Sequence, residues 1–215
     1  MNHRPAALAS GICTQESVDA PPVRILHGVV TPPSERLRTL LDAAGVARCL
    51  DAIAGAIHER WAAEPRLALV GVYQRGVPFA RALLERLRAR GLEPDFGRLD
   101  ITQYRDDLQT MTVLPKLEGS DIDFDLDDAV VILCDEVIHT ARTTRAALEE
   151  LLGFGRPRCV QIAALIDRAG RELPLYPRYT GLQVELPAGE RVCVRFADGD
   201  GIDEVFTCPW DKHTA

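Results

Sequence analysis

The sequence predicts an α/β fold in which a mostly parallel sheet is flanked by helices. Continuous apolar runs such as Ala129 to Cys134 are typical of strands buried on both faces. Between these runs, apolar residues recur with helical periodicity. Because strands that alternate with helices favour parallel pairing, we expect one sheet with helices packed against it.

The elements of the first half follow from these two patterns. Apolar residues at three- and four-residue spacing predict one or two amphipathic helices; they are Leu37, Leu40, Leu41, Ala44, Val46, Leu50, Ile53, Ile57 and Trp61. A strand is expected over Leu67 to Tyr73, then a helix over Phe79 to Arg90 that stops near Gly91. A strand over Arg98 to Thr102 continues the alternation.

The second half continues the same alternation. The Ala129 strand should lead into a helix over Thr143 to Leu152, and Cys159 to Ile166 should form another buried strand. Shorter strands are expected over Arg191 to Phe196 and Glu204 to Thr207, with a turn at Gly199 to Gly201 between them.

Length and composition indicate one domain. With 215 residues, 47% of them hydrophobic, the chain can bury a sizeable core, and we expect it over residues 34–210. Residues 1–33 are rich in Pro, Ala and small polar residues and are expected to form a flexible extension. No apolar run is long enough for a membrane span and no signal pattern is present, so a cytoplasmic protein without membrane association is expected.

Charge and cysteine usage further limit the classes of protein that fit this sequence. A net charge of −7 lacks the overall basic character of a nonspecific nucleic-acid binder, although a local basic patch stays open. The six cysteines show no C-x-x-C pair and no metal-ligand spacing. We therefore expect reduced core thiols rather than a zinc site or disulfides.

The segment Ala129 to Leu151 carries the strongest chemical signal. A buried strand delivers two acids, Asp135 and Glu136, and then a Thr-rich turn, Thr140 to Thr143, into a helix. Backbone N–H groups and the helix dipole at such a turn favour an anion, and carboxylates beside them suit sugar hydroxyls. A sugar phosphate fits both features. The alternative is that the two acids only cap the helix.

This segment resembles the phosphoribosyl-diphosphate (PRPP) signature of type I phosphoribosyltransferases, which Asp135, Glu136, Thr140 and Thr143 match. Three further blocks, at Leu69–Ala80, Asp100–Leu108 and Leu165–Gly181, are similar in order and approximate spacing to the PyrR family, bifunctional pyrimidine-operon regulators and uracil phosphoribosyltransferases. The resemblance runs from about Leu40 to about Val205. It implies a type I phosphoribosyltransferase-like fold with a small hood, and an enzyme that makes UMP from uracil and PRPP with Mg²⁺.

The resemblance also implies roles for individual residues. PRPP would be bound by Arg75 and Gly76 at its pyrophosphate, by Asp135 and Glu136 at its ribose, and by the turn Thr140, Ala141, Arg142 and Thr143 at its 5′-phosphate. The hood loop Tyr104, Arg105, Asp106 and Asp107 would close over the substrate, with Arg105 beside the leaving group. His139 and Arg168 would lie on the base side, and Asp167 would hold Mg²⁺ through water. An ion pair between Arg171 and Glu172 would support the last loop.

Three positions depart from the family pattern. Glu136 replaces the usual Asp, His139 replaces the usual Tyr, and Ala141 replaces the signature glycine. If φ is positive at Ala141, the alanine costs on the order of 1 kcal/mol. His139 beside the base could donate or accept a proton, or only substitute in packing. Asp135, Glu136, Arg105 and His139 are the candidate catalytic residues.

Two other functions stay open. Members of this family also bind messenger RNA of pyrimidine genes, so the chain could be a nucleotide-sensing regulator with weak or no catalysis. The expected RNA-contact positions, Asp51, Gly55 and Arg60, include an acid and a glycine, which are poor phosphate contacts. A phosphoribosyltransferase for another base is the second alternative. The resemblance implies a homodimer or a larger homo-oligomer.

Overall fold

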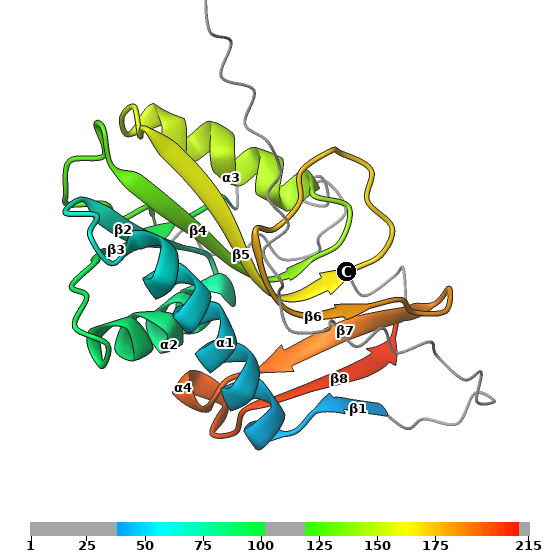
Figure 1. Ribbon diagram of the computed structural model, residues 1–215. Coiled ribbons are helices and arrows are strands. Elements are labelled where there is room, and N and C mark those ends of the chain that lie inside the picture. Colours follow the sequence, from blue (N-terminus) through cyan, green and yellow to red (C-terminus); the bar gives the residue numbers. More distant parts are fainter. Residues whose placement is uncertain (1–37, 102–118, 211–215) are drawn as a thin grey trace, which may run out of the picture.

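The computed structural model describes residues 38–101 and 119–210, and a five-stranded parallel sheet forms its centre (Figure 1). The strand order is β3-β2-β4-β5-β6. The strands are β2 (Leu67–Val72), β3 (Asp95–Leu99), β4 (Val130–Ile138), β5 (Cys159–Arg168) and β6 (Tyr179–Val184). The expectation of a mostly parallel sheet flanked by helices is confirmed.

Helices cover the two faces of this sheet. Alternate residues of β4 enter two cores: Ile132 packs in a cluster with α1 (Ala43–Trp61) and α2 (Gly76–Arg88), whereas Leu133 packs with α3 (Arg142–Gly153). Burial on both faces explains why this strand reads as an uninterrupted apolar run. The chain therefore leaves β2 toward one face of the sheet and leaves β4 toward the other.

A second, smaller sheet is antiparallel and has the strand order β1-β8-β7. It consists of β1 (Arg38–Leu41), β7 (Glu190–Arg195) and β8 (Glu204–Pro209), with the short α4 (Ala197–Asp200) between the last two. We call it the hood sheet. Phe196 stacks on Phe79 of α2 with ring centroids 6.4 Å apart, which joins the hood sheet to the main core.

Several element boundaries differ from the sequence expectation. Residues Arg38–Leu41 form an edge strand rather than part of a helix, because pairing with β8 overrides the helical spacing. The helix begins only after Asp42, whose side chain accepts a hydrogen bond from Gly45 N at 2.7 Å. Strand β3 starts and ends three residues before the expected Arg98–Thr102, and β6 was not expected at all. No helix among the described residues has the length and hydropathy of a membrane span.

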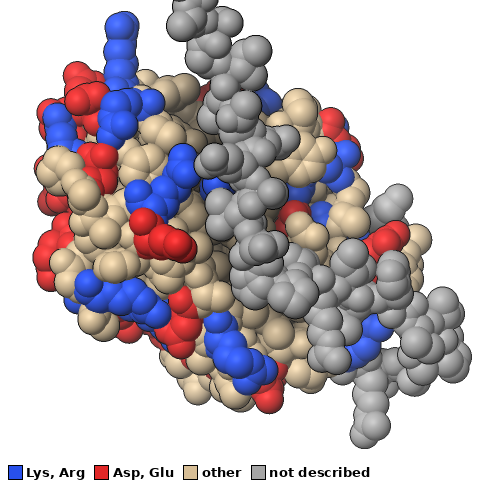
Figure 2. Space-filling view, in the orientation of Figure 1, with Lys and Arg blue, Asp and Glu red and all other residues tan. Residues whose placement is uncertain are grey.

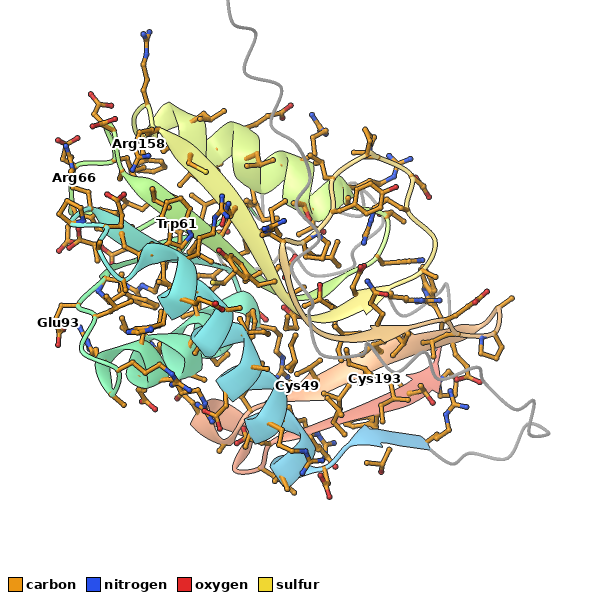
Figure 3. The ribbon with its side chains drawn as sticks, viewed as in Figure 1. Cys49, Trp61, Arg66, Glu93, Arg158 and Cys193 are labelled. Atoms are coloured by element: carbon orange, nitrogen blue, oxygen red, sulfur yellow. A yellow bond between two sulfur atoms is a disulfide. The ribbon has the colours of Figure 1, made fainter. Side chains whose placement is uncertain are left out.

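The expectation that all cysteines are reduced is wrong for two of them. Cys193 on β7 and Cys208 on β8 form a disulfide across adjacent strands, and Figure 3 labels Cys193 in the hood sheet. Sequence spacing could not reveal this pair, because the strand register that brings the two residues together comes from tertiary structure. Cys134 is a free buried thiol, as expected, and Cys49 and Cys159 are also free.

The disulfide should stabilise the hood sheet measurably. Cross-linking residues 15 apart in sequence restricts the unfolded chain by about 3 kcal/mol. We therefore expect Cys193→Ser/Cys208→Ser to lower the free energy of unfolding in denaturant titrations by about that amount, and reductant to have no further effect on the variant. Cys49→Ser, which removes an unbridged thiol, is the matched control. A double variant as stable as the wild type under oxidising conditions would contradict this expectation.

Candidate active site

The carboxyl ends of β2 and β4 are where the topology of an open α/β sheet predicts a ligand crevice. The two strands pair in parallel, with Gly71 opposite Cys134, yet the helices that follow them lie on opposite faces of the sheet. Open α/β sheets bind ligands at such a topological switch point. The loop from Tyr73 to Arg75 follows one strand, and the loop from His139 to Ala141 follows the other.

Two helix N-termini border this crevice. Helix α2 begins after Arg75 and α3 begins after Ala141, and neither N-cap residue forms a side-chain capping bond. Neither helix has an acidic residue in its first turn. Because the first N–H groups of a helix have no intrahelical partner and carry the positive end of its dipole, both N-termini favour anions.

Close backbone contacts bring the first of these N-termini against β4. A Cβ atom at Gly76 would lie 2.5 Å from Cys134 O and 3.2 Å from Asp135 Cα, and a Cβ at Gly71 would lie 2.7 Å from Val77 Cα. Only glycine fits at these contacts. The Tyr73–Gln74 peptide bond in the same loop is cis. The Arg75–Gly76 loop and the Asp135 segment are therefore immediate neighbours.

The acid pair lies within β4 rather than after it, because the strand extends to Ile138. Asp135 is buried, with 7% of its surface exposed, and Glu136 is half-buried. Burial, together with the neighbouring charge of Glu136, raises the pKa of Asp135 well above its usual value. A buried carboxyl group at the mouth of a crevice is a typical functional group.

Ala141 adopts the left-handed conformation, with φ 71° and ψ 12°. The positive φ expected at the signature glycine is therefore present, and the alanine is strained there. Its methyl group is buried in a small apolar cluster with Ile138, Ile162 and Ala164. The backbone turn at this residue is what directs the chain from β4 into α3.

The segment after β5 supports this turn, by contacts other than the one expected. Backbone N–H groups of Glu172 and Leu173 donate to Thr140 O at 3.1 and 3.2 Å. The expected Arg171–Glu172 pair is absent: Arg171 pairs with Asp167 and donates to His139 O, whereas Glu172 pairs with Arg142 at 2.7 Å. The two side chains leave this irregular segment in different directions, so each has its own partner.

Arg75 contacts the hood sheet. Its guanidinium pairs with Asp200 of α4, and Arg81 on α2 pairs with Asp198 at 3.1 Å. A hydrogen bond from Phe196 N and the Arg75 guanidinium hold the pKa of Asp200 below its usual value. The cation that the sequence assigns to pyrophosphate thus has an acidic partner from the C-terminal part of the chain.

The two base-side candidates lie near each other and near a residue that the sequence did not single out. Trp210, at the end of the described chain, lies 6.1 Å from His139 between ring centroids and 5.6 Å from the guanidinium carbon of Arg168. Burial, and then the charges of Arg168 and Arg171, lower the pKa of His139, so this ring is neutral near pH 7. An isolated aromatic residue after a strand carries no periodic signal, which is why Trp210 was missed.

Of the remaining candidate site residues, two lie in the described part of the chain and four do not. Asp167 and Arg168 are the last residues of β5 at the same sheet edge. The hood loop Tyr104, Arg105, Asp106 and Asp107 lies outside the described residues. Among residues 38–101 and 119–210, no group of three or more His, Cys, Asp or Glu side chains could hold a metal ion unaided.

Comparison with known proteins agrees with this geometry. The family model described as phosphoribosyl transferase domain matches residues 37–192. A curated relative from Akkermansia muciniphila, named bifunctional protein PyrR, is 42% identical over 176 residues, covering 82% of this chain and 97% of its own. A relative of the same name from Acetivibrio thermocellus is 40% identical over 174 residues, covering 80% and 95%.

Solved structures show the same fold at low sequence identity. The hypoxanthine phosphoribosyltransferase of Trypanosoma cruzi is 14% identical, with a TM-score of 0.61 over 81% of this chain and 97% of that one. A hypoxanthine-guanine phosphoribosyltransferase from Bacillus anthracis has a TM-score of 0.58 and covers 80% and 97%. The type I phosphoribosyltransferase architecture, with its hood, is thereby confirmed.

Replacing Ala141 by glycine should leave stability almost unchanged. Relief of the left-handed strain is worth on the order of 1 kcal/mol, and loss of the buried methyl costs about 0.8 kcal/mol. We expect the free energy of unfolding to change by less than about 1 kcal/mol in denaturant titrations. Ala146→Gly, at a buried helical position of α3, is the control and should destabilise clearly more. Equal losses in both variants would show that Ala141 is not strained.

Replacing Asp135 by asparagine should stabilise the ligand-free protein at neutral and alkaline pH. Because burial raises the pKa of Asp135 above its unfolded value, the folded chain binds more protons in that window and loses stability as the pH rises through it. The melting temperature of Asp135→Asn relative to wild type should therefore rise from pH 4 toward pH 8, by about 2–4 °C for each kcal/mol.

The exposed Asp125, whose pKa is lowered by a backbone bond from Asp127 and by Arg66, provides the control of opposite sign. Asp125→Asn should bring no gain at any pH. A difference between Asp135→Asn and wild type that stays constant with pH would mean that Asp135 is not the group responsible.

Proposed function

Because this chain belongs to the bifunctional PyrR family of phosphoribosyltransferases, we propose that it transfers the 5-phosphoribosyl group of PRPP to uracil, yielding UMP and pyrophosphate. One observation supports this most: two uncapped helix N-termini border a carboxylate pair at the carboxyl ends of adjacent strands. PRPP has the matching distribution of charge, with phosphates at both ends of a ribose.

We assign each part of PRPP to a part of the crevice. The 5′-phosphate binds the turn Thr140, Ala141, Arg142 and Thr143, at the N-terminus of α3, where it would compete with the long contact of 3.4 Å from Arg142 N to Thr140 Oγ1. The ribose hydroxyls donate to Asp135 and Glu136. The pyrophosphate lies at Arg75 and Gly76, so that binding exchanges Asp200 for the substrate as the partner of Arg75. The same positions are the ones that the resemblance implies.

The chemistry is a displacement at the anomeric carbon. The bond from this carbon to the pyrophosphate oxygen breaks, uracil N1 forms the new bond, and the N1 proton is released. Carboxylates below an oxocarbenium-like ribose and donors around the departing pyrophosphate stabilise the transition state. Neutral His139 is a proton acceptor on the base side, and Arg105 in the hood loop is assigned to the leaving group.

Magnesium fits the donors that this crevice offers. Carboxylate oxygens are the ligands that Mg²⁺ prefers, and the ion commonly uses one or two of them together with substrate phosphates and water. That mode suits a site without a three-residue metal cluster among the described residues. Asp167, which pairs with Arg171 through Oδ1, would hold the ion through water. When bound, the ion supplies charge neutralisation at the pyrophosphate.

Loss of the Asp135 carboxylate should weaken PRPP. A charged acceptor lost from a buried hydrogen bond costs about 1.5–3 kcal/mol, so Asp135→Asn should raise the Kd for PRPP in calorimetry at least about tenfold. Asp125→Asn, on the exposed surface, should bind PRPP as the wild type does. Turnover is assayed with PRPP, Mg²⁺ and a panel of bases. Unchanged PRPP affinity in Asp135→Asn would refute the site assignment.

RNA binding is the second candidate function, since the curated relatives carry the name bifunctional protein. On α1, Asp51 pairs with Arg86 at 3.1 Å and with Arg90 at 3.8 Å, so its negative charge offsets part of the positive charge of these two arginines. In the view that shows α1, basic and acidic side chains of the described residues are interspersed (Figure 2). We propose that this chain, as a cytoplasmic homodimer or larger homo-oligomer, binds pyrimidine-gene messenger RNA weakly.

Variants on the α1 surface test whether uracil transfer, rather than RNA binding, is the main activity of this chain. A Cβ at Gly55 meets no atom within 4 Å, so a larger side chain fits there. Asp51→Thr/Gly55→His should raise RNA affinity, and binding should fall steeply with salt because each neutralised phosphate releases counterions. The double variant should leave uracil turnover unchanged. Tight, sequence-selective RNA binding by the wild type with no turnover would reverse the ranking.

A further inference from the structure

Arg168 is a largely buried cation whose donors have no acceptor among the described residues. Only 8% of its surface is exposed, and within residues 38–101 and 119–210 its side chain forms no hydrogen bond or ion pair. Burial lowers the pKa of this guanidinium, and the charge of Glu190 opposes that effect. No guanidinium nitrogen of Arg168 is among the fully buried atoms that lack a partner, so solvent reaches its five N–H donors. These donors, at the end of β5, are therefore available to acceptors on a ligand.

Trp210 lies over this guanidinium. The guanidinium carbon is 5.6 Å from the ring centroid, within the range of a cation–π contact. The backbone of Trp210 is held by a hydrogen bond from its N–H to Gly189 O at 2.7 Å, next to the paired strands β7 and β8. The side chain is nevertheless 39% exposed, so a large aromatic surface at the site has no protein cover.

His139 completes the group from a third element. Its ring meets the Trp210 ring edge to face, at 71° between planes. Gly170 fixes the space for this imidazole, because a Cβ there would lie 2.6 Å from His139 Nε2. A neutral imidazole, a donor-only guanidinium and an indole thus converge from the loop after β4, the end of β5 and the end of β8.

We propose that Trp210 is a specificity-determining residue for the acceptor base: its indole covers the face of a planar, neutral heterocycle whose carbonyl oxygens accept from Arg168. This inference rests on the proposed phosphoribosyl transfer. Stacking requires a flat ligand, and donors without acceptors favour carbonyl groups over amino groups at the contacted edge. Trp210 acts on base binding alone, because the phosphate-binding turns belong to α2 and α3.

Steady-state kinetics with Trp210 variants separate an effect on uracil binding from an effect on PRPP binding. Trp210→Ala should raise KM for uracil about tenfold, the size of a lost aromatic stacking contact, with KM for PRPP changed less than about twofold. Trp210→Phe keeps a stacking ring and should recover most of the affinity for uracil. Equal rises in both KM values, or no rise in either, would overturn the proposal.

Fluorescence gives a second readout that does not need turnover. The chain has two tryptophans, and Trp61 lies toward the end of α1, far from the labelled Cys193 of the hood sheet (Figure 3). Trp61→Phe leaves Trp210 as the single reporter, and the former partners Tyr179 and Gln161 stay hydrogen-bonded to each other at 2.6 Å. Uracil or UMP should quench this emission, and cytosine should quench it less.

The matched control is Trp210→Phe, in which Trp61 is the only reporter and the same ligands should leave emission unchanged. If the wild type makes no UMP but uracil quenches Trp210, the proposed transfer fails and the base contact stands. If UMP is made but neither uracil nor UMP quenches Trp210, the base contact fails and the transfer stands.

Discussion

The backbone contact between Gly76 and β4 is the constraint on which the arrangement of the crevice depends. The beginning of α2 lies so close to Cys134 O and Asp135 Cα that a Cβ atom at residue 76 would clash with them. Because α2 and α3 lie on opposite faces, their N-termini could otherwise be separated by the full thickness of the sheet. The close contact brings the N-terminus of α2 next to the β4 carboxylates, the arrangement on which the proposed binding of PRPP depends.

Two charged groups whose burial is unfavourable lie at the same end of the parallel sheet. Burial disfavours the charge of Asp135, and Arg168 is a cation without a paired acid in the described chain. Burial disfavours the charged form of both groups, and a ligand with hydroxyls and carbonyls would give each of them a further hydrogen-bond partner. Such unfavourable burial is common where a protein prepares a site for a bound molecule rather than for its own stability.

Local patterns predicted the parts of the structure that local physics determines. The β4–α3 segment was found from sequence because a doubly buried strand and an amphipathic helix have distinct periodicities. The prediction failed where tertiary pairing decides the outcome. Residues Arg38–Leu41 have helical spacing but pair with β8, and Cys193 meets Cys208 only through the β7–β8 register.

At the candidate site, residue identity was easier to predict than side-chain partnership. The acids, the turn and the Arg75 loop gather at one sheet edge, as parallel strands require. By contrast, Arg171 pairs with Asp167 and Glu172 with Arg142, since the direction of each side chain depends on the loop after β5. Trp210 contributes no pattern to the sequence, and only the fold brings it beside Arg168.

The hood sheet joins the first and last strands of the described chain, and this sets an order of assembly during synthesis. The parallel sheet is complete once Val184 has been made, whereas β1 must wait for β8 before it gains its partner. Chains fold from the N-terminus as they emerge, so the turns proposed to bind phosphate can form, together with His139 and Arg168, while Trp210 is still missing. A nascent chain would then hold most of the proposed site before Trp210 reaches it.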